Sequence, residues 1–230
     1  MHLIDRRVHD KTPTAYLLKE AWLTEHRFYI DERALIPRSY IAELLEEDLA
    51  PWAADPETVQ SVLDLCTVSG CLAILAQGAF PNAKVTGSDI SQAALEVAKI
   101  NRRDYDMEET LELVQSDLFE NLQGRRFDII ISNPPYLTAE EMAHLMPETA
   151  REPAMALDGG ADGLDFYRLL TAHYRDALRP GGWLVLEIGC AQAADVLALG
   201  AANGWVNGSC RKDYGSNDRA VLLQKPEKSC

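Results

Sequence analysis

The sequence predicts an α/β fold with a doubly wound, mostly parallel sheet of seven strands and helices on both faces. Short apolar segments alternate with helical segments along most of the chain, a pattern typical of parallel strands joined by crossover helices. Polar residues follow four consecutive strands at their carboxyl ends, the edge at which such sheets bind ligands. The first 57 residues lack this alternation. We therefore expect a lead-in over residues 1–57 and one α/β domain over residues 58–230.

Each expected strand is a short apolar run that ends at a polar residue or a turn signal. The expected strands cover residues 61–66, 84–89, 111–117, 127–132 and 183–189, with a weak strand in 204–213 and a clear one in 219–224. The expected helices cover residues 70–79, 91–104, 162–178 (or 163–178) and 191–203. Ser91 can cap the second helix, because its hydroxyl can accept an unpaired N–H of the first turn. Pro180, Gly181 and Gly182 are expected to end the third helix.

The lead-in shows two local patterns. The segment FYIDERALIPR at 28–38 alternates apolar and polar residues like a β-hairpin and stops at Pro37. The segment IAELLEED at 41–48 has the spacing of a helix. Because so short a segment cannot build an independent core, we interpret it as a lead-in with a hairpin and a helix.

The composition is that of a globular protein and weighs against several functional classes. Of 230 residues, 47% are apolar and 25% are charged, and no uninterrupted apolar run reaches the roughly 18 residues of a membrane span. The first residues are too polar for a secretory signal, and five cysteines without a C-x-x-C pair fit free thiols in a cytoplasmic protein. The histidines lack metal-ligand spacing, so we expect no metal. The net charge of −14 disfavours direct nucleic-acid binding and suits a basic partner.

Four consecutive strands are followed by residues that can hold a nucleotide-like ligand. The turn at 64–70 joins the first strand to its helix, where backbone N–H groups and a helix N-terminus can face the ligand. The candidate ligand-binding residues of this turn are Asp64, Cys66, Thr67, Val68, Ser69 and Gly70. Asp89, with Ile90 beside it, ends the second strand and can accept both hydroxyls of a ribose. Asp117 and Leu118 end the third strand and can hold an adenine by one carboxylate and one apolar contact.

The residues Asn133, Pro134, Pro135 and Tyr136 follow the fourth strand. Two prolines fix φ and lack an N–H, so they form a stiff loop whose carbonyl groups stay free. The Asn133 amide both donates and accepts hydrogen bonds, and Tyr136 adds a flat aromatic face. These groups can bind a planar –NH₂ group, which makes Asn133, Pro134 and Tyr136 candidate catalytic residues. The alternative is a strand-to-loop turn closed by prolines.

Longer motifs give a resemblance that extends from Thr14 to Gln224. They are YLLKEAWL, FYIDERALIPRS, VLDLCTVSGCLAI, VTGSDIS, QSDLF, IISNPPY, REPAMALDGGADGLDFYRLL, LRPGGWLVLEIG and KDYGSNDRAVLL. The chain resembles the HemK/Prm family of protein-glutamine methyltransferases, which methylate a glutamine side-chain amide with S-adenosyl-L-methionine. The resemblance implies a Rossmann-like class I methyltransferase domain with a final antiparallel strand pair. It also implies that the residues after the first four strands line the cofactor and that Asn133, Pro134, Pro135 and Tyr136 hold the substrate amide.

Two branches of that family are separable by sequence. The segments LIPRS, EAWL and FYIDER resemble the branch that methylates the third protein of the large ribosomal subunit. The closing KDYGSNDRAVLL is more similar to the branch that methylates peptide chain release factors. We therefore expect a glutamine of a ribosomal protein as the substrate, and next a glutamine of a release factor.

Three departures from the family pattern bear on activity. Most of the helical recognition domain that precedes the matching segments in the family has no counterpart here, and Gly208 and Ser209 weaken the sixth strand. Val68 replaces the first glycine of the family's Gly-x-Gly turn. If that position needs positive φ, a β-branched residue costs about 1–3 kcal/mol, or roughly five- to a hundredfold in affinity. Val68 and the missing front domain support one alternative, a catalytically impaired paralogue. The other alternative is an adenine-amino methyltransferase acting on nucleic acid, because NPPY loops serve that chemistry too.

Overall fold

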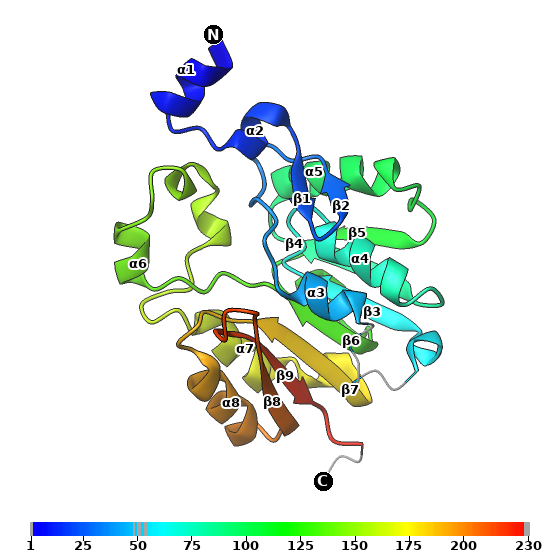
Figure 1. Cartoon of the computed structure of the whole chain (residues 1–230). Helices are drawn as coiled ribbons and strands as arrows, with labels where there is room; N and C mark the ends of the chain where they lie inside the picture. The colour runs from blue at the N-terminus through cyan, green and yellow to red at the C-terminus, as the bar shows by residue number, and fades with distance from the viewer. Residues whose placement is uncertain (1, 48, 50–51, 53–54, 228–230) are drawn as a thin grey trace.

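The computed structural model describes residues 2–47, 49, 52 and 55–227. A seven-stranded sheet runs through its centre, with helices on both faces (Figure 1). The strands are β1 (Ala21–Leu23), β2 (His26–Phe28), β3 (Ser61–Leu65), β4 (Lys84–Asp89), β5 (Leu111–Gln115), β6 (Phe127–Ser132), β7 (Leu178–Glu187), β8 (Val206–Lys212) and β9 (Asp218–Gln224). The α-helices are α1 (His2–Val8), α2 (Thr14–Leu18), α3 (Ile41–Glu46), α4 (Cys71–Ala79), α5 (Gln92–Asp104), α6 (Ala139–Ala143), α7 (Asp165–His173) and α8 (Ala193–Ala202). Short 3-10 helices are η1 (Pro56–Thr58), η2 (Glu120–Leu122), η3 (Thr149–Arg151), η4 (Ala154–Ala156) and η5 (Arg175–Ala177).

The strand order in the main sheet is β5-β4-β3-β6-β7-β9-β8. The first five strands in this order run parallel to one another, and β9 runs antiparallel to both β7 and β8. The predicted mostly parallel sheet and its final antiparallel pair are therefore confirmed.

Side chains of the central strands alternate between two cores. Val62, Ile129 and Ile131 pack with α3 and α4, whereas Leu63 and Ile130 pack with α7 and α8 on the other face. Successive residues of a strand point to opposite faces, so a parallel sheet covered on both sides reads as a continuous apolar run. Because α3 packs into the first core, the lead-in shares the core of the main domain.

The order of the strands reverses between β3 and β6. From β3 the chain adds β4 and β5 on one side, and from β6 it adds β7 on the other. At the carboxyl ends, the two crossover connections therefore leave in opposite directions, and a crevice forms between Cys66 and Asn133. The fold places the predicted ligand-binding edge at this point.

The hairpin of the lead-in lies earlier than predicted. It consists of β1 and β2, joined through Thr24 and Glu25, and Thr24 takes a φ of +52°. The prediction of a hairpin at 28–38 is wrong, because Phe28 ends β2 and residues 29–38 run without regular structure across the main domain. The Asn101 side chain on α5 explains this path. It accepts a hydrogen bond from the Tyr29 N–H at 2.7 Å and donates to the carbonyls of Tyr29 at 3.0 Å and Ser69 at 2.8 Å.

The Pro180-Gly181-Gly182 sequence lies inside a strand and does not end a helix. Helix α7 ends at His173, and β7 already begins at Leu178. The pairing of β6 with β7 contains a bulge at this point, where Gly181 has a φ of +78°. A Cβ on Gly182 would lie 2.7 Å from the Asp128 carbonyl oxygen, so the strands approach too closely for a side chain.

Other boundaries differ by a few residues. Strand β5 ends at Gln115, so Asp117 lies in the loop beyond it. The helix predicted at 41–48 is α3, which ends at Glu46, and residue 48 lies outside the described residues. Among the helices that the structure describes, none is long and apolar enough to cross a membrane.

Candidate active site

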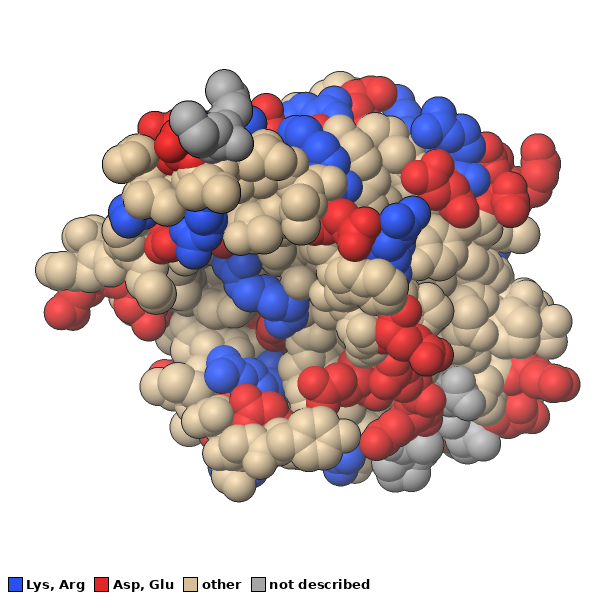
Figure 2. Space-filling view, turned by 45° about the horizontal axis from the view of Figure 1, so that its top comes forward, with Lys and Arg blue, Asp and Glu red and all other residues tan. Residues whose placement is uncertain are grey.

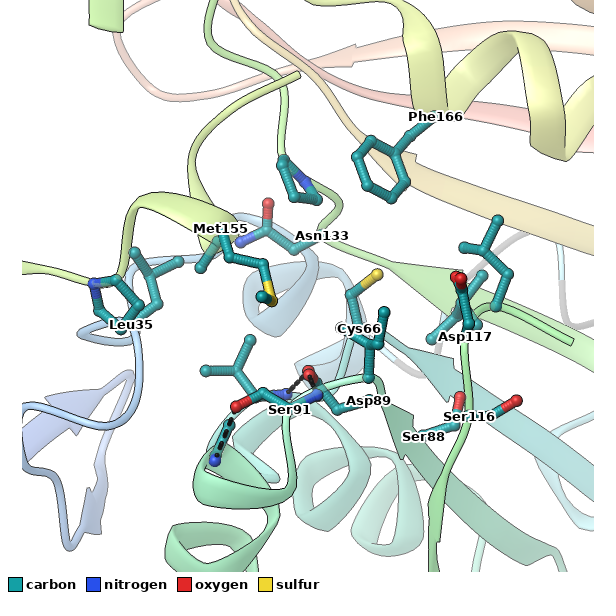
Figure 3. A pocket seen from close by; sticks show the side chains of 18 of the residues that line it. Leu35, Cys66, Ser88, Asp89, Ser91, Ser116, Asp117, Asn133, Met155 and Phe166 are labelled. Carbon is teal, nitrogen blue, oxygen red and sulfur yellow. Dashed lines mark hydrogen bonds between the residues drawn. The ribbon is translucent and has the colours of Figure 1, made fainter. Parts of the chain in front are cut away.

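A cavity of about 260 Å³ lies at the carboxyl edge of the sheet (Figure 3). Of the predicted site residues it is lined by Cys66, Val68, Asp89, Ile90, Asp117, Leu118, Asn133 and Pro135. Figure 3 shows Asp117 at one end and Leu35 at the other, with Asp89 between them. The structure thus brings together side chains from the ends of four strands, as the topology requires.

The turn after β3 has an unusual backbone. Cys66, Val68 and Gly70 all have positive φ, at +63°, +51° and +78°. A Cβ on Gly70 would lie 3.1 Å from the Ala98 Cβ, so both its φ and its close approach to α5 favour glycine. The Thr67 N–H donates a hydrogen bond to the Ser88 carbonyl at 2.9 Å, and this bond ties the turn to β4.

Asp89 connects this turn to the next strand. Its Oδ2 accepts the Val68 N–H at 2.9 Å, and its Oδ1 accepts the Ser91 N–H at 2.8 Å. Burial raises the pKa of the Asp89 carboxyl, while these backbone hydrogen bonds lower it. Since a carboxylate has about four acceptor sites, two N–H bonds leave capacity for a pair of hydroxyls from the cavity.

Asp64 lies behind the turn and does not line the cavity. Its side chain is fully buried, and Oδ2 accepts the Thr67 hydroxyl at 2.5 Å. Burial raises the pKa of the Asp64 carboxyl to about 7, against the opposing effect of the Thr67 hydroxyl. Asp64 and Thr67 therefore support the turn from its buried side. Like these two residues, Ser69 and Gly70 do not line the cavity.

Asn133 lies between the main cavity and a second cavity of about 200 Å³. The two cavities share Leu35, Asn133 and Ala156. Tyr136 lines the second cavity only, and Pro134 lines neither. A group bound in one cavity and a group bound in the other can therefore both reach the Asn133 amide.

The backbone at Tyr136 is fixed by residues far along the chain. Gln192 donates through Nε2 to the carbonyls of Tyr136 at 3.0 Å and Gly163 at 3.1 Å. Its Oε1 accepts the Gly189 N–H at 2.8 Å. A Cβ on Gly159 would lie 2.7 Å from the Tyr136 Cα, which leaves room only for glycine. These contacts set the position of the loop that follows Asn133.

The lead-in and the loop before η4 close the site from above. Glu152 is buried and accepts hydrogen bonds from the Ile36 N–H at 3.0 Å and from Arg38 Nη1 at 2.9 Å. On the far side, the Ser39 hydroxyl bonds to Glu187 at the end of β7. Burial raises the pKa of the Glu187 carboxyl to about 7, and the Ser39 hydroxyl lowers it.

Sequence reasoning missed much of the cavity wall. The further lining residues are Arg33, Leu35, Leu65, Ser88, Ser91, Ala94, Ser116, Pro153, Met155, Ala156 and Phe166. Arg33 and Leu35 stand inside FYIDERALIPRS, and Phe166 inside the segment GGADGLDFYRLL, but nothing in their local pattern marks them as site residues. Among the described residues, no group of three or more His, Cys, Asp or Glu side chains is placed to hold a metal ion.

Comparison with known proteins gives this geometry a context. Residues 43–160 match the family Methyltransferase small domain. The chain is 50% identical over 205 residues to the ribosomal protein uL3 glutamine methyltransferase of Burkholderia pseudomallei, an alignment that covers 86% of this chain and 67% of that protein. Identity to the protein of the same name from Bordetella pertussis is 52% over 189 residues, covering 82% and 63%. The chain thus spans 63–67% of the length of these two relatives.

Solved structures agree on the fold. A methyltransferase from Pyrococcus furiosus superposes with a TM-score of 0.65 at 18% identity, covering 86% of this chain and 88% of that one. The 16S rRNA N2 G1207 methyltransferase of Thermus thermophilus, in complex with AdoMet and guanosine, gives 0.60 at 19% identity, covering 90% and 49%. At such identities the likeness shows the fold alone, and it confirms the predicted Rossmann-like fold.

Replacing Val68 with Gly is expected to raise the free energy of unfolding by about 1 kcal/mol, because glycine takes positive φ without a Cβ penalty. The turn holds this φ in the folded chain, so the strain lowers folding stability. The loss of cofactor affinity expected from the sequence stays a prediction. Urea denaturation of both proteins measures the difference.

Val68→Ala is the matched control, since it shortens the side chain but keeps a Cβ at the same φ. It is expected to be less stable than Val68→Gly. If the glycine variant were the less stable of the two, the packing of residue 68 would outweigh its backbone strain.

The free energy of unfolding is expected to fall as the pH rises from about 5 to about 8, because the buried Asp64 carboxyl loses its proton in this range. Its pKa is about 7 in the folded protein, so the folded state binds the proton more tightly than the unfolded state does. The free energy of unfolding then decreases with pH, by an amount on the order of 3 kcal/mol. Denaturation of the wild type and of Asp64→Asn across this pH range tests this. Equal slopes for the two proteins would show that Asp64 does not carry the effect.

Proposed function

Because the chain belongs to the family of ribosomal protein uL3 glutamine methyltransferases, we propose that it methylates the side-chain amide nitrogen of a glutamine in that ribosomal protein. The methyl donor is S-adenosylmethionine. The observation that carries the proposal is the position of Asn133 between two cavities, one suited to the cofactor and one to a substrate side chain.

The main cavity fits the donor by chemistry. Asp89 offers buried carboxylate oxygens for the ribose hydroxyls, and Leu118 and Phe166 offer apolar surface for the adenine beside Asp117. When bound, S-adenosylmethionine supplies a methyl group activated on a positively charged sulfur. Asn133 and Pro135 line the same cavity, and Asn133 also lines the second one.

The second cavity suits a glutamine side chain. An amide nitrogen is a weak nucleophile, because its lone pair is delocalised into the carbonyl group. The side-chain oxygen of Asn133, which lines both cavities, can accept an amide proton, and this favours the charge that develops on nitrogen as it attacks. Pro134 lines neither cavity, so its carbonyl, the second acceptor expected from the sequence, has no part in this assignment. Tyr136 lines this cavity and can pack against the amide plane. The Gln192 and Gly159 contacts hold the loop in place, so Asn133 is positioned before the substrate arrives.

The net charge of the chain and the names of its relatives favour the ribosomal protein over other methyl acceptors. The relatives described above carry uL3 in their names, and a chain of net charge −14 attracts a basic substrate. On the face shown in Figure 2, Lys and Arg are interspersed with Asp and Glu and form no single basic surface. A release factor is the next candidate, because KDYGSNDRAVLL is similar to that branch. A ribosomal substrate also implies action in the cytoplasm.

Asn133→Ala is expected to lower kcat by about a hundredfold to a thousandfold while changing the Kd for S-adenosylmethionine less than about threefold. The reason is that the amide oxygen meets the substrate nitrogen, whereas Asp89 carries the ribose. Methyl transfer to purified uL3 and calorimetric titration of the cofactor measure the two quantities. Asn82→Ala, at an exposed position before β4, is the matched control and should leave both unchanged.

Comparable losses of turnover and of cofactor affinity would contradict this assignment. They would mean that Asn133 acts mainly as a cofactor or fold residue.

A further inference from the structure

Arg33 is the cation of the main cavity. Among the described residues that line this cavity, it is the one Lys or Arg side chain, and the other charged groups are Asp89 and Asp117. A negatively charged group of a ligand bound there would meet attraction at Arg33 and repulsion at both carboxylates.

The guanidinium of Arg33 is held in a defined orientation. Its Nε donates to Asp31 Oδ1 at 2.9 Å, and its Nη2 donates to Asp31 Oδ2 at 2.6 Å. Asp31 is buried, and the Tyr29 hydroxyl donates to the same carboxylate at 2.9 Å. Hydrogen bonds from Arg33 lower the pKa of the Asp31 carboxyl to about 2, so the pair stays ionised.

The pair leaves part of the guanidinium unused. Arginine has five N–H donors in a fixed plane, and the two side-chain contacts with Asp31 occupy Nε–H and one hydrogen of Nη2. Both hydrogens of Nη1 lie outside this pair. A planar carboxylate is the ligand group that matches such donors best.

The place of Arg33 in the cavity determines which part of a bound ligand lies beside its guanidinium. If the adenine lies beside Asp117 and the ribose on Asp89, the rest of the cofactor extends toward Leu35, at the opposite end in Figure 3. Val68 packs there against the buried cluster that contains Ile30 and Ala34, so the chain around Arg33 lies against the turn after β3. The cofactor's amino-acid tail is the part that reaches this end.

We propose that Arg33, oriented by Asp31, binds the carboxylate of the amino-acid tail of S-adenosylmethionine. This inference rests on the proposed cofactor. It assigns to the lead-in a direct role in selecting a ligand with an intact amino acid, in addition to closing the site. Asp31 acts as a positioning residue, because it holds the guanidinium and does not line the cavity.

The test compares two ligands by isothermal titration calorimetry. S-adenosylmethionine carries the amino-acid tail, and 5′-methylthioadenosine keeps the adenine, ribose and sulfur but lacks the tail. In Arg33→Met, the Kd for S-adenosylmethionine should rise by about tenfold to a hundredfold, whereas the Kd for 5′-methylthioadenosine should change less than about threefold. Arg33→Lys should recover only part of the loss, since it keeps the charge but not the planar donors.

Two controls keep the result interpretable. Arg125 is as exposed as Arg33 and makes two contacts with Glu112 away from the cavity, so Arg125→Met should leave both affinities unchanged. Asp31→Asn combined with Arg33→Met removes the carboxylate that the single variant leaves buried without its partner. If Arg33→Met fails to fold, this double variant carries the comparison.

Equal weakening of both ligands, or of neither, would overturn the assignment of Arg33. If the wild type binds neither ligand, the proposed cofactor itself is wrong, and that failure is distinct from a loss confined to the variants.

Discussion

The reversal of strand order between β3 and β6 is the constraint on which the rest of the structure depends. It leaves a crevice at the carboxyl edge of the sheet, and both Cys66 and Asn133 lie at that edge directly after their strands. Asp89 then ties the turn after β3 to the end of β4 through the Val68 N–H. One buried carboxylate therefore both shapes the turn and faces the cavity.

The lead-in completes this crevice. Asn101 holds its Tyr29 backbone against α5, and Glu152 holds Ile36 and Arg38 against the loop above the site. These anchors are hydrogen bonds between side chains of one segment and the backbone or side chains of another, so the lead-in is positioned without regular pairing to the sheet. The main cavity consequently has a floor made by the sheet edge and a wall made by the lead-in.

The sheet and its functional edge were predictable because each rests on local signals. A buried parallel strand reads as an apolar run, and Asp89 ends one such strand while Asn133 directly follows another. The hairpin was placed too late, because its turn at Thr24 carries neither Gly nor Asn to mark a positive φ. Gly181 was read as a helix end, since the bulge that it forms depends on pairing with β6. The wall residue Met155 comes from η4, which is distant in sequence from the strands of the site, and no periodicity in its own segment reveals which cavity it lines.

We propose that Asn133 presents a glutamine amide of a ribosomal protein to a methyl donor in the adjoining cavity. The most direct measurement incubates the purified chain and S-adenosylmethionine with each of three acceptors in turn, namely uL3, a release factor and an adenine-containing RNA. Mass spectrometry then locates any added methyl group. We expect one methyl group on a glutamine side-chain nitrogen of uL3. Methylation of adenine, or binding of the cofactor with transfer to none of the three acceptors, would contradict it.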